Sequence, residues 1–115
     1  PAIGEPLRML GNLLRAAGLI EAGIDGLSER ELGVVVAEAM MSLSKRVGFP
    51  TRLLEVEGFS TEHIQRALMA AKDPQLRMKL ENMPVPLTAE MVDEYMGSVL
   101  EAARDGDLSL IKNVP

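Results

Sequence analysis

Few residues in this sequence could do chemistry, and its only histidine is His63. A transition-metal site needs several His, Cys, Asp or Glu ligands that converge on one point. The chain contains no cysteine, which also removes thiolate nucleophiles and disulfides. We therefore expect His63 to be a solvated residue in the first turn of a helix, and we predict no metal-binding residue.

Motifs for phosphate binding and for nucleophilic catalysis are also missing from the sequence. Gly18, Gly23 and Gly26 lie between two expected helices, whereas a nucleotide-binding loop joins a strand to a helix. No serine has the surroundings of a nucleophile elbow, and His63 has no partner that would complete a triad. The sequence therefore predicts no catalytic and no cofactor-binding residue.

Three acidic residues, Glu90, Asp93 and Glu94, gather at the start of the last expected helix. The helix dipole favours acidic side chains at this position without any metal. We therefore interpret them as a solvated helix start.

The basic residues and the methionines each allow two interpretations. Lys45 and Arg46 lie at the end of an expected helix, where the dipole favours cations, and Arg52 follows the next turn. At most, these three residues predict a weak anion site.

The eight methionines could form an adaptable binding surface, but their helical spacing favours the filling of an apolar core.

Composition restricts both the fold class and the partners. Apolar residues make up 47% of the chain, and only three residues are aromatic, so the core must be aliphatic and helices packed on helices are favoured. The net charge of −5 opposes binding to the phosphates of nucleic acids. No apolar run approaches the roughly 20 residues that span a bilayer, and no signal peptide is visible. We expect a cytoplasmic protein with neither a nucleic-acid nor a membrane partner.

The first half of the sequence predicts two helices. Apolar residues at helical spacing predict the first over 6–17, with Gly18 as its stop and an inward face of Leu7, Leu10, Leu13, Leu14 and Ala17. The second begins after Ser28, which forms a capping box with Glu31, and it ends at Gly48. Because this second helix is apolar nearly all round, we expect it to be central and covered on several sides.

The second half predicts further helices around a stiff loop. Ser60 caps a third helix, which a short helical segment follows. The sequence Met-Pro-Val-Pro at 83–86 forces an extended backbone, and Thr88 then caps a last long helix. The tail, 108–115, gives no clear signal. We predict one all-α domain over residues 1–115, a helical bundle of about four to five helices.

Two segments resemble iron-containing, metal-dependent alcohol dehydrogenases. Residues 26–31 (GLSERE), leading to 43–51 (LSKRVGFPT), resemble the stretch in which a capped helix of that family ends in an "lgiPt" turn. Residues 85–92 (VPLTAEMV) are similar to the family's late "NPRPLTxEDI" segment, which starts its last helix. The order and spacing of the two segments also suit the family, and the resemblance covers the chain from Leu7 onward.

The resemblance implies the C-terminal helical domain of such an enzyme, with a fold like the α domain of dehydroquinate synthase. In the family, an N-terminal α/β domain binds NAD or NADP, and one Asp and three His hold Fe²⁺ or Zn²⁺. These residues would lie upstream of this chain. The chain is therefore expected to be a C-terminal fragment that is inactive alone, binds no cofactor itself, pairs with the missing nucleotide-binding domain and self-associates.

The sequence also departs from the family. Before the last helix, many relatives have Cys and Asn-Pro-Arg, whereas this chain has no Cys and reads Met-Pro-Val at 83–85. No substrate-contacting residue is therefore carried over. Two alternatives stay open: a stand-alone helical module that binds a partner helix, and the ligand-binding domain of a regulator.

Overall fold

A computed structural model describes residues 3–21 and 23–115, and all of its regular elements are helical. The prediction of an all-α fold is confirmed over this part of the chain. The chain divides into two compact units, Pro1–Thr51 and Arg52–Pro115. Two compact units can belong to one domain or to two, so the single domain predicted over 1–115 stays a prediction. No helix within the described residues combines the length and the apolarity needed to cross a membrane.

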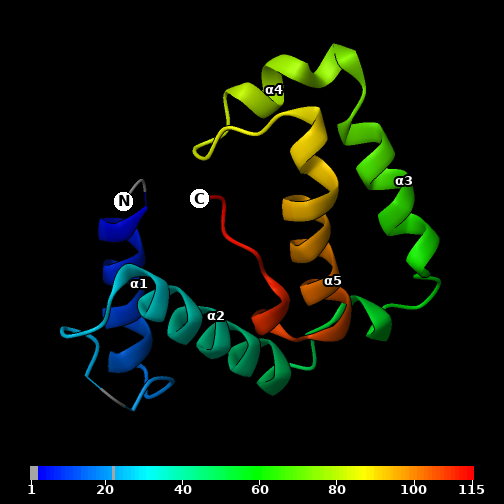
Figure 1. Cartoon of the computed structure of the whole chain (residues 1–115). Coiled ribbons are helices and arrows are strands. Elements are labelled where there is room, and N and C mark those ends of the chain that lie inside the picture. The colour runs from blue at the N-terminus through cyan, green and yellow to red at the C-terminus, as the bar shows by residue number, and fades with distance from the viewer. Residues whose placement is uncertain (1–2, 22) are drawn as a thin grey trace. The chain divides into compact units, whose positions relative to one another are not determined.

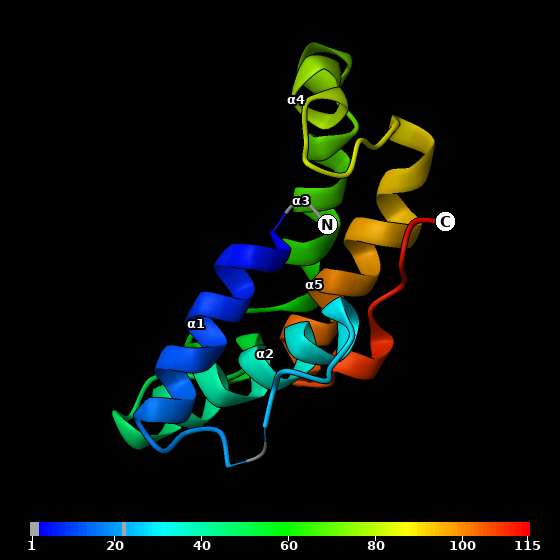
Figure 2. The same cartoon turned by 90° about the vertical axis from the view of Figure 1, so that its left-hand side faces the viewer.

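The first unit consists of two helices and the loop between them. Helix α1 (Gly4–Ala16) packs across α2 (Glu29–Arg46), as Figures 1 and 2 show. The loop contributes two isoleucines to the core between the helices. Six buried residues form this core, which we call the first core: Leu14, Ile20, Ile24, Leu32, Val36 and Ala39.

Gly11 permits the close approach of α1 to this core. It is buried, and a Cβ atom placed on it would lie 2.9 Å from Ile24 Cδ1 and 3.3 Å from Leu32 Cδ1. The inward face of α1 therefore runs through Leu7, Leu10, Gly11 and Leu14. Leu13, which the apolar spacing placed on that face, is exposed instead.

Local sequence signals set the ends of the two helices. Glu31 accepts hydrogen bonds from both the backbone N–H and the hydroxyl of Ser28, each at 2.8 Å, so the predicted capping box is confirmed. At the other end of α2, Gly48 has a φ of 79° and Phe49 N–H donates to Ser44 C=O at 2.8 Å. This is the Schellman geometry, in which glycine avoids the Cβ penalty of a left-handed residue.

The prediction that α2 is central is wrong. Val36 is only 2% exposed, but Leu43 is 43% exposed and Met40 is 50% exposed. The buried residues of α2 are Leu32, Val36 and Ala39, and all three belong to the first core that α2 shares with α1 and the loop. The second half of α2 therefore presents apolar side chains at its surface.

The second unit contains three α-helices, α3 (Thr61–Ala71), α4 (Arg77–Glu81) and α5 (Gly97–Asp105). In Figure 1, α3 runs beside the helical stretch that ends in α5, and α4 lies in the connection between them. Leu80, Leu87 and Val92 form a smaller buried cluster, which we call the second core. Ile64 is also buried, on α3.

The last helix predicted from Thr88 is a continuous stretch of three geometries. A 3-10 turn (Ala89–Met91) passes into a π-helical turn (Val92–Met96) and then into α5. We call this stretch the last helix. Gly106, with a φ of 72°, ends it.

The tail packs back on the last helix. After a 3-10 turn (Leu108–Leu110), the chain is extended, and Lys112 N–H donates to Ser98 Oγ at 3.0 Å. Val114 packs against the second core. The tail is thus a wall of the second unit.

Candidate functional site

His63 lies in the first turn of α3, where its ring serves the backbone. Nδ1 accepts a hydrogen bond from the Ser60 amide at 3.0 Å, and the ring stacks on Phe59 with the centroids 5.7 Å apart. Histidine thus takes the place that Glu or Gln usually holds in a capping box. The prediction that His63 is an exposed residue of this turn is confirmed.

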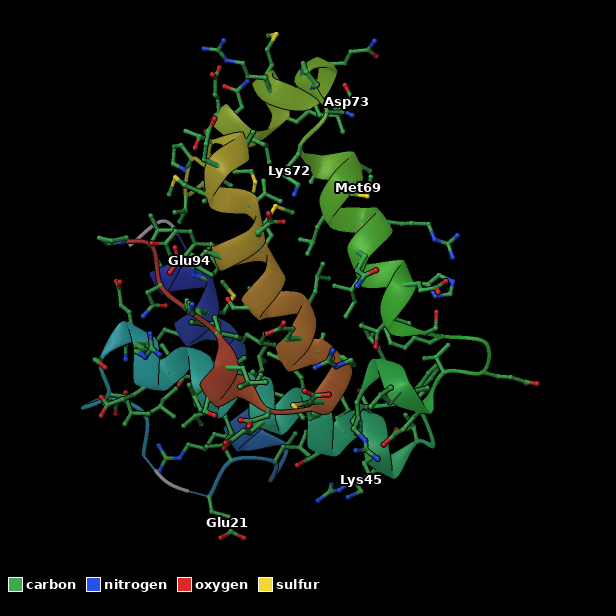
Figure 3. All side chains as sticks on the ribbon, turned by 45° about the vertical axis from the view of Figure 1, so that its right-hand side comes forward. Glu21, Lys45, Met69, Lys72, Asp73 and Glu94 are labelled. Carbon is green, nitrogen blue, oxygen red and sulfur yellow. The ribbon has the colours of Figure 1, made fainter. Side chains whose placement is uncertain are left out.

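The three acids of the last helix have separate partners. Lys72 Nζ lies 2.8 Å from Asp93 Oδ2, and Figure 3 shows Lys72 at the end of α3 that adjoins the last helix. Glu94 Oε1 lies 3.4 Å from Lys112 Nζ. The carboxylate of Glu90 accepts a hydrogen bond from its own backbone N–H, which is the main cause of its lowered pKa. No group of three or more potential metal ligands occurs among residues 3–21 and 23–115.

The basic residues that could form an anion site fall in both units. Lys45 and Arg46 are exposed in the last turn of α2, whereas Arg52 belongs to the second unit and pairs with Glu55, with 3.0 Å between Nε and Oε1. A cavity of about 270 Å³ beside Lys45 is also lined by Glu38, whose carboxylate opposes an anion. These contacts add no support for an anion site.

A pocket of about 310 Å³ with charged residues in its lining lies among the end of α3, α4 and the start of the last helix. Its two cations are Lys72 and Arg77, and its lining also contains three acids. Arg77 Nε lies 2.6 Å from Glu81 Oε1, and Lys72 is paired with Asp93. Because the acids of the lining outnumber its two cations, the pocket offers an anion no net attraction.

A second hollow of about 360 Å³, which we call the apolar groove, lies between the last helix and the tail. The loop before the last helix and the tail both contribute to its lining. Eight of the ten lining residues are apolar or aromatic, and Lys112 is the only charged one among them. The lining consists of Met83, Val85 and Leu87 from the loop, Tyr95, Met96, Val99 and Leu100 from the last helix, and Lys112, Asn113 and Val114 from the tail.

Ser98 holds the tail wall of this groove in place. Its hydroxyl is buried, donates to Tyr95 C=O at 2.8 Å and accepts from Lys112 N–H at 3.0 Å. Ser98 thus ties the π-helical turn to the tail. Sequence reasoning missed both this contact and the groove, although the apolar residues of the tail, at 108, 110, 111 and 114, were a signal that the tail packs on something.

Most of the methionines are not core filling, which corrects the preferred interpretation. Five of the eight are exposed: Met9, Met40, Met69, Met78 and Met83. The other three are half-buried, and two of these, Met91 and Met96, pack against the second core. Flexible, polarisable side chains at a surface suit an adaptable contact better than a fixed core.

Comparisons of the chain with protein-family models, with curated proteins and with solved structures find no match. The candidate site is therefore defined by its geometry, as an apolar surface of the second unit with one cation at its edge.

Proposed function

We propose that this chain forms the helical C-terminal part of an iron-dependent NAD(P) alcohol dehydrogenase. In this proposal, the rest of the enzyme supplies the nicotinamide cofactor site and the metal ligands. The helices described above form a wall of the cleft and contribute packing surface.

Two features of the segments that resemble this family support the proposal. The segments occur in the family's order, and each lies at a helix boundary. Residues 26–31 contain the capping box that starts α2, and 43–51 contain the glycine turn that ends it. Residues 85–92 lead from the extended loop into the last helix. Each segment lies at the kind of helix boundary at which the family has it.

Exposed apolar side chains support the proposal independently. Among the residues that the structure describes, sixteen large hydrophobic side chains are exposed, including Val47 at 62% and Phe49 at 69%. Single exposed apolar residues are common, but contiguous apolar surface marks a place where another protein surface packs. The rest of the enzyme, or a second subunit, would cover such residues.

The chemistry assigned to the parent enzyme does not fit the described residues of this chain. Hydride transfer needs a nicotinamide, and in this family a metal polarises the alcohol or carbonyl oxygen. The one histidine caps α3, and Asp93 and Glu94 are in ion pairs. We therefore assign no catalytic, metal-binding or cofactor-binding role to any residue here.

A second candidate function, a stand-alone module for protein interaction, is favoured by the apolar groove. The groove is open, apolar and lined by two methionines, Met83 and Met96, a composition suited to a partner helix. The two candidates differ in what precedes the chain in its gene.

The test is to read the gene upstream of Pro1 in the same frame. The dehydrogenase proposal expects a continuous frame that encodes a glycine-rich segment after a strand and a later region with three histidines and an aspartate. A stop codon followed by a start codon just before Pro1 would contradict the proposal and would favour the interaction module.

A further inference from the structure

The lining of the apolar groove includes two polar residues, both from the tail. Met96 and Val99 of the last helix and Val85 of the loop supply apolar lining, while Lys112 and Asn113 of the tail supply the polar lining. A hollow of about 360 Å³ lies within the size range of small-molecule sites, which join apolar walls to a few polar groups that fix orientation. The groove has this arrangement without any contribution from the first unit.

Charge decides which class of small molecule fits. Lys112 is the only charged residue that lines the groove, and Asn113 beside it can donate a hydrogen bond from its amide. A ligand with an apolar chain and an anionic end would match both parts. A cationic end would face Lys112 and is disfavoured.

The existing partner of Lys112 is a weak competitor. Glu94 Oε1 lies 3.4 Å from Lys112 Nζ, longer than the 2.7–2.9 Å typical of strong charge-assisted bonds, and both side chains are more than half exposed. Exposed ion pairs contribute little to stability. A ligand carboxylate can therefore take the place of Glu94 at small cost.

We propose that the apolar groove binds an aliphatic carboxylate, with its chain along Met96 and Val99 and its carboxylate at Lys112. This site lies in the second unit alone and does not depend on the function proposed for the parent enzyme. Ser98 contributes indirectly, because its hydrogen bond to the Lys112 amide holds the tail wall.

The test uses decanoate and decanol as probes, each below the concentration at which it aggregates, with binding to the full chain measured by isothermal titration calorimetry. We expect one decanoate per chain and weaker binding of decanol. Lys112→Ala should weaken decanoate binding about two- to fivefold, the range expected for an exposed ion pair, and leave decanol binding unchanged. Glu94→Gln should strengthen decanoate binding, because it removes the competing carboxylate.

Two further variants separate the groove from general stickiness. Val99→Asp places a charge among the apolar lining at a side chain that is 47% exposed, so the fold should tolerate it and both probes should bind more than tenfold more weakly. Lys79→Ala removes an exposed lysine of α4 that does not line the groove, and should change nothing. The proposal is overturned if decanoate does not bind, if decanol binds equally well, or if Lys112→Ala and Lys79→Ala behave alike.

Discussion

The two units of this chain are stabilised in different ways. The first has a core of six buried aliphatic residues, contributed by two helices and the short loop between them. The second has a buried cluster of three residues, and polar contacts join segments that are far apart in sequence, such as Lys72 with Asp93 and Ser98 with Lys112. The first unit thus depends mainly on apolar burial, with one long-range hydrogen bond from Arg8 Nη1 to Ile24 C=O at 3.3 Å, whereas the second also depends on the hydrogen bond that holds its tail.

The largest expected effect contrasts two positions on α2. Val36→Asp puts an unpaired charge into the first core, where Val36 is 2% exposed, and should cost more than about 4 kcal/mol, enough to unfold the unit. Leu43→Asp, at a side chain that is 43% exposed, should cost less than about 1 kcal/mol. Chemical denaturation followed by circular dichroism measures both. Equal losses would show that the second half of α2 is covered.

The same substitution in each core gives the next contrast. Leu32→Ala leaves a cavity in a fully buried site and should destabilise the first unit by about 2–5 kcal/mol. Leu87→Ala should destabilise the second unit by an amount at the lower end of that range, because the surrounding loop can move into the cavity that the substitution leaves. Unit-specific hydrogen exchange separates the two. A larger loss at Leu87 would reverse the comparison of the two cores.

Ser98→Ala tests the polar contacts of the second unit. The substitution leaves the Lys112 amide without its acceptor and should cost about 1–2 kcal/mol, with faster exchange of that amide. Ser42→Ala, at an exposed position of α2, is the matched control and should leave exchange in the tail unchanged. If the Lys112 amide exchanges its hydrogen as slowly in the Ser98 variant as in the parent chain, the tail is held by its apolar residues alone.

The smallest effects concern the two capping boxes, the first formed by Ser28 and Glu31 at the start of α2 and the second by Ser60 and His63 at the start of α3. Hydrogen bonds from Ser28, first from its backbone N–H and then from its hydroxyl, lower the pKa of Glu31. Because this pKa is lowered by folding, the carboxylate contributes stability above its unfolded pKa, and that contribution is lost as the pH falls through the folded pKa. Glu31→Gln should therefore reduce the loss of stability of α2 on acidification.

His63→Glu makes the second box like the first. A carboxylate at this position suits the positive end of the helix dipole and should stabilise α3 by about 0.3–1 kcal/mol at neutral pH. Thermal denaturation of the variant and the parent chain measures the change. A destabilised variant would mean that the stacking of His63 on Phe59 outweighs the gain from the carboxylate.

The sequence predicted those features that depend on a few neighbouring residues. Ser28 and Glu31 are three positions apart, so the pattern alone contains the needed information. At the other end of α2, Gly48 N–H donates to Lys45 C=O and Phe49 N–H donates to Ser44 C=O, and these contacts are local as well. The first helix begins at Gly4 rather than at Pro6, because proline is tolerated anywhere in a first turn whose N–H groups have no helical acceptor.

Features that depend on distant contacts were not predictable in the same way. Apolar spacing placed Leu13 inside and gave α2 a central position, but spacing cannot tell how many neighbours are available to cover a face. The contact of Ser98 with Lys112 joins residues fourteen positions apart, and neither residue type signals it. The apolar groove follows from that contact, so it could not be found before the tail was placed.

The most direct test of the proposed function is to measure the oxidation of simple alcohols with NAD and with NADP, in the presence of added iron or zinc. The pure chain should give no turnover, because none of its described residues fits the metal or nicotinamide chemistry. The product of the extended upstream reading frame, assayed in the same way, should reduce the cofactor at a measurable rate. Turnover by this chain alone, or none by the extended protein with metal and cofactor bound, would contradict the account.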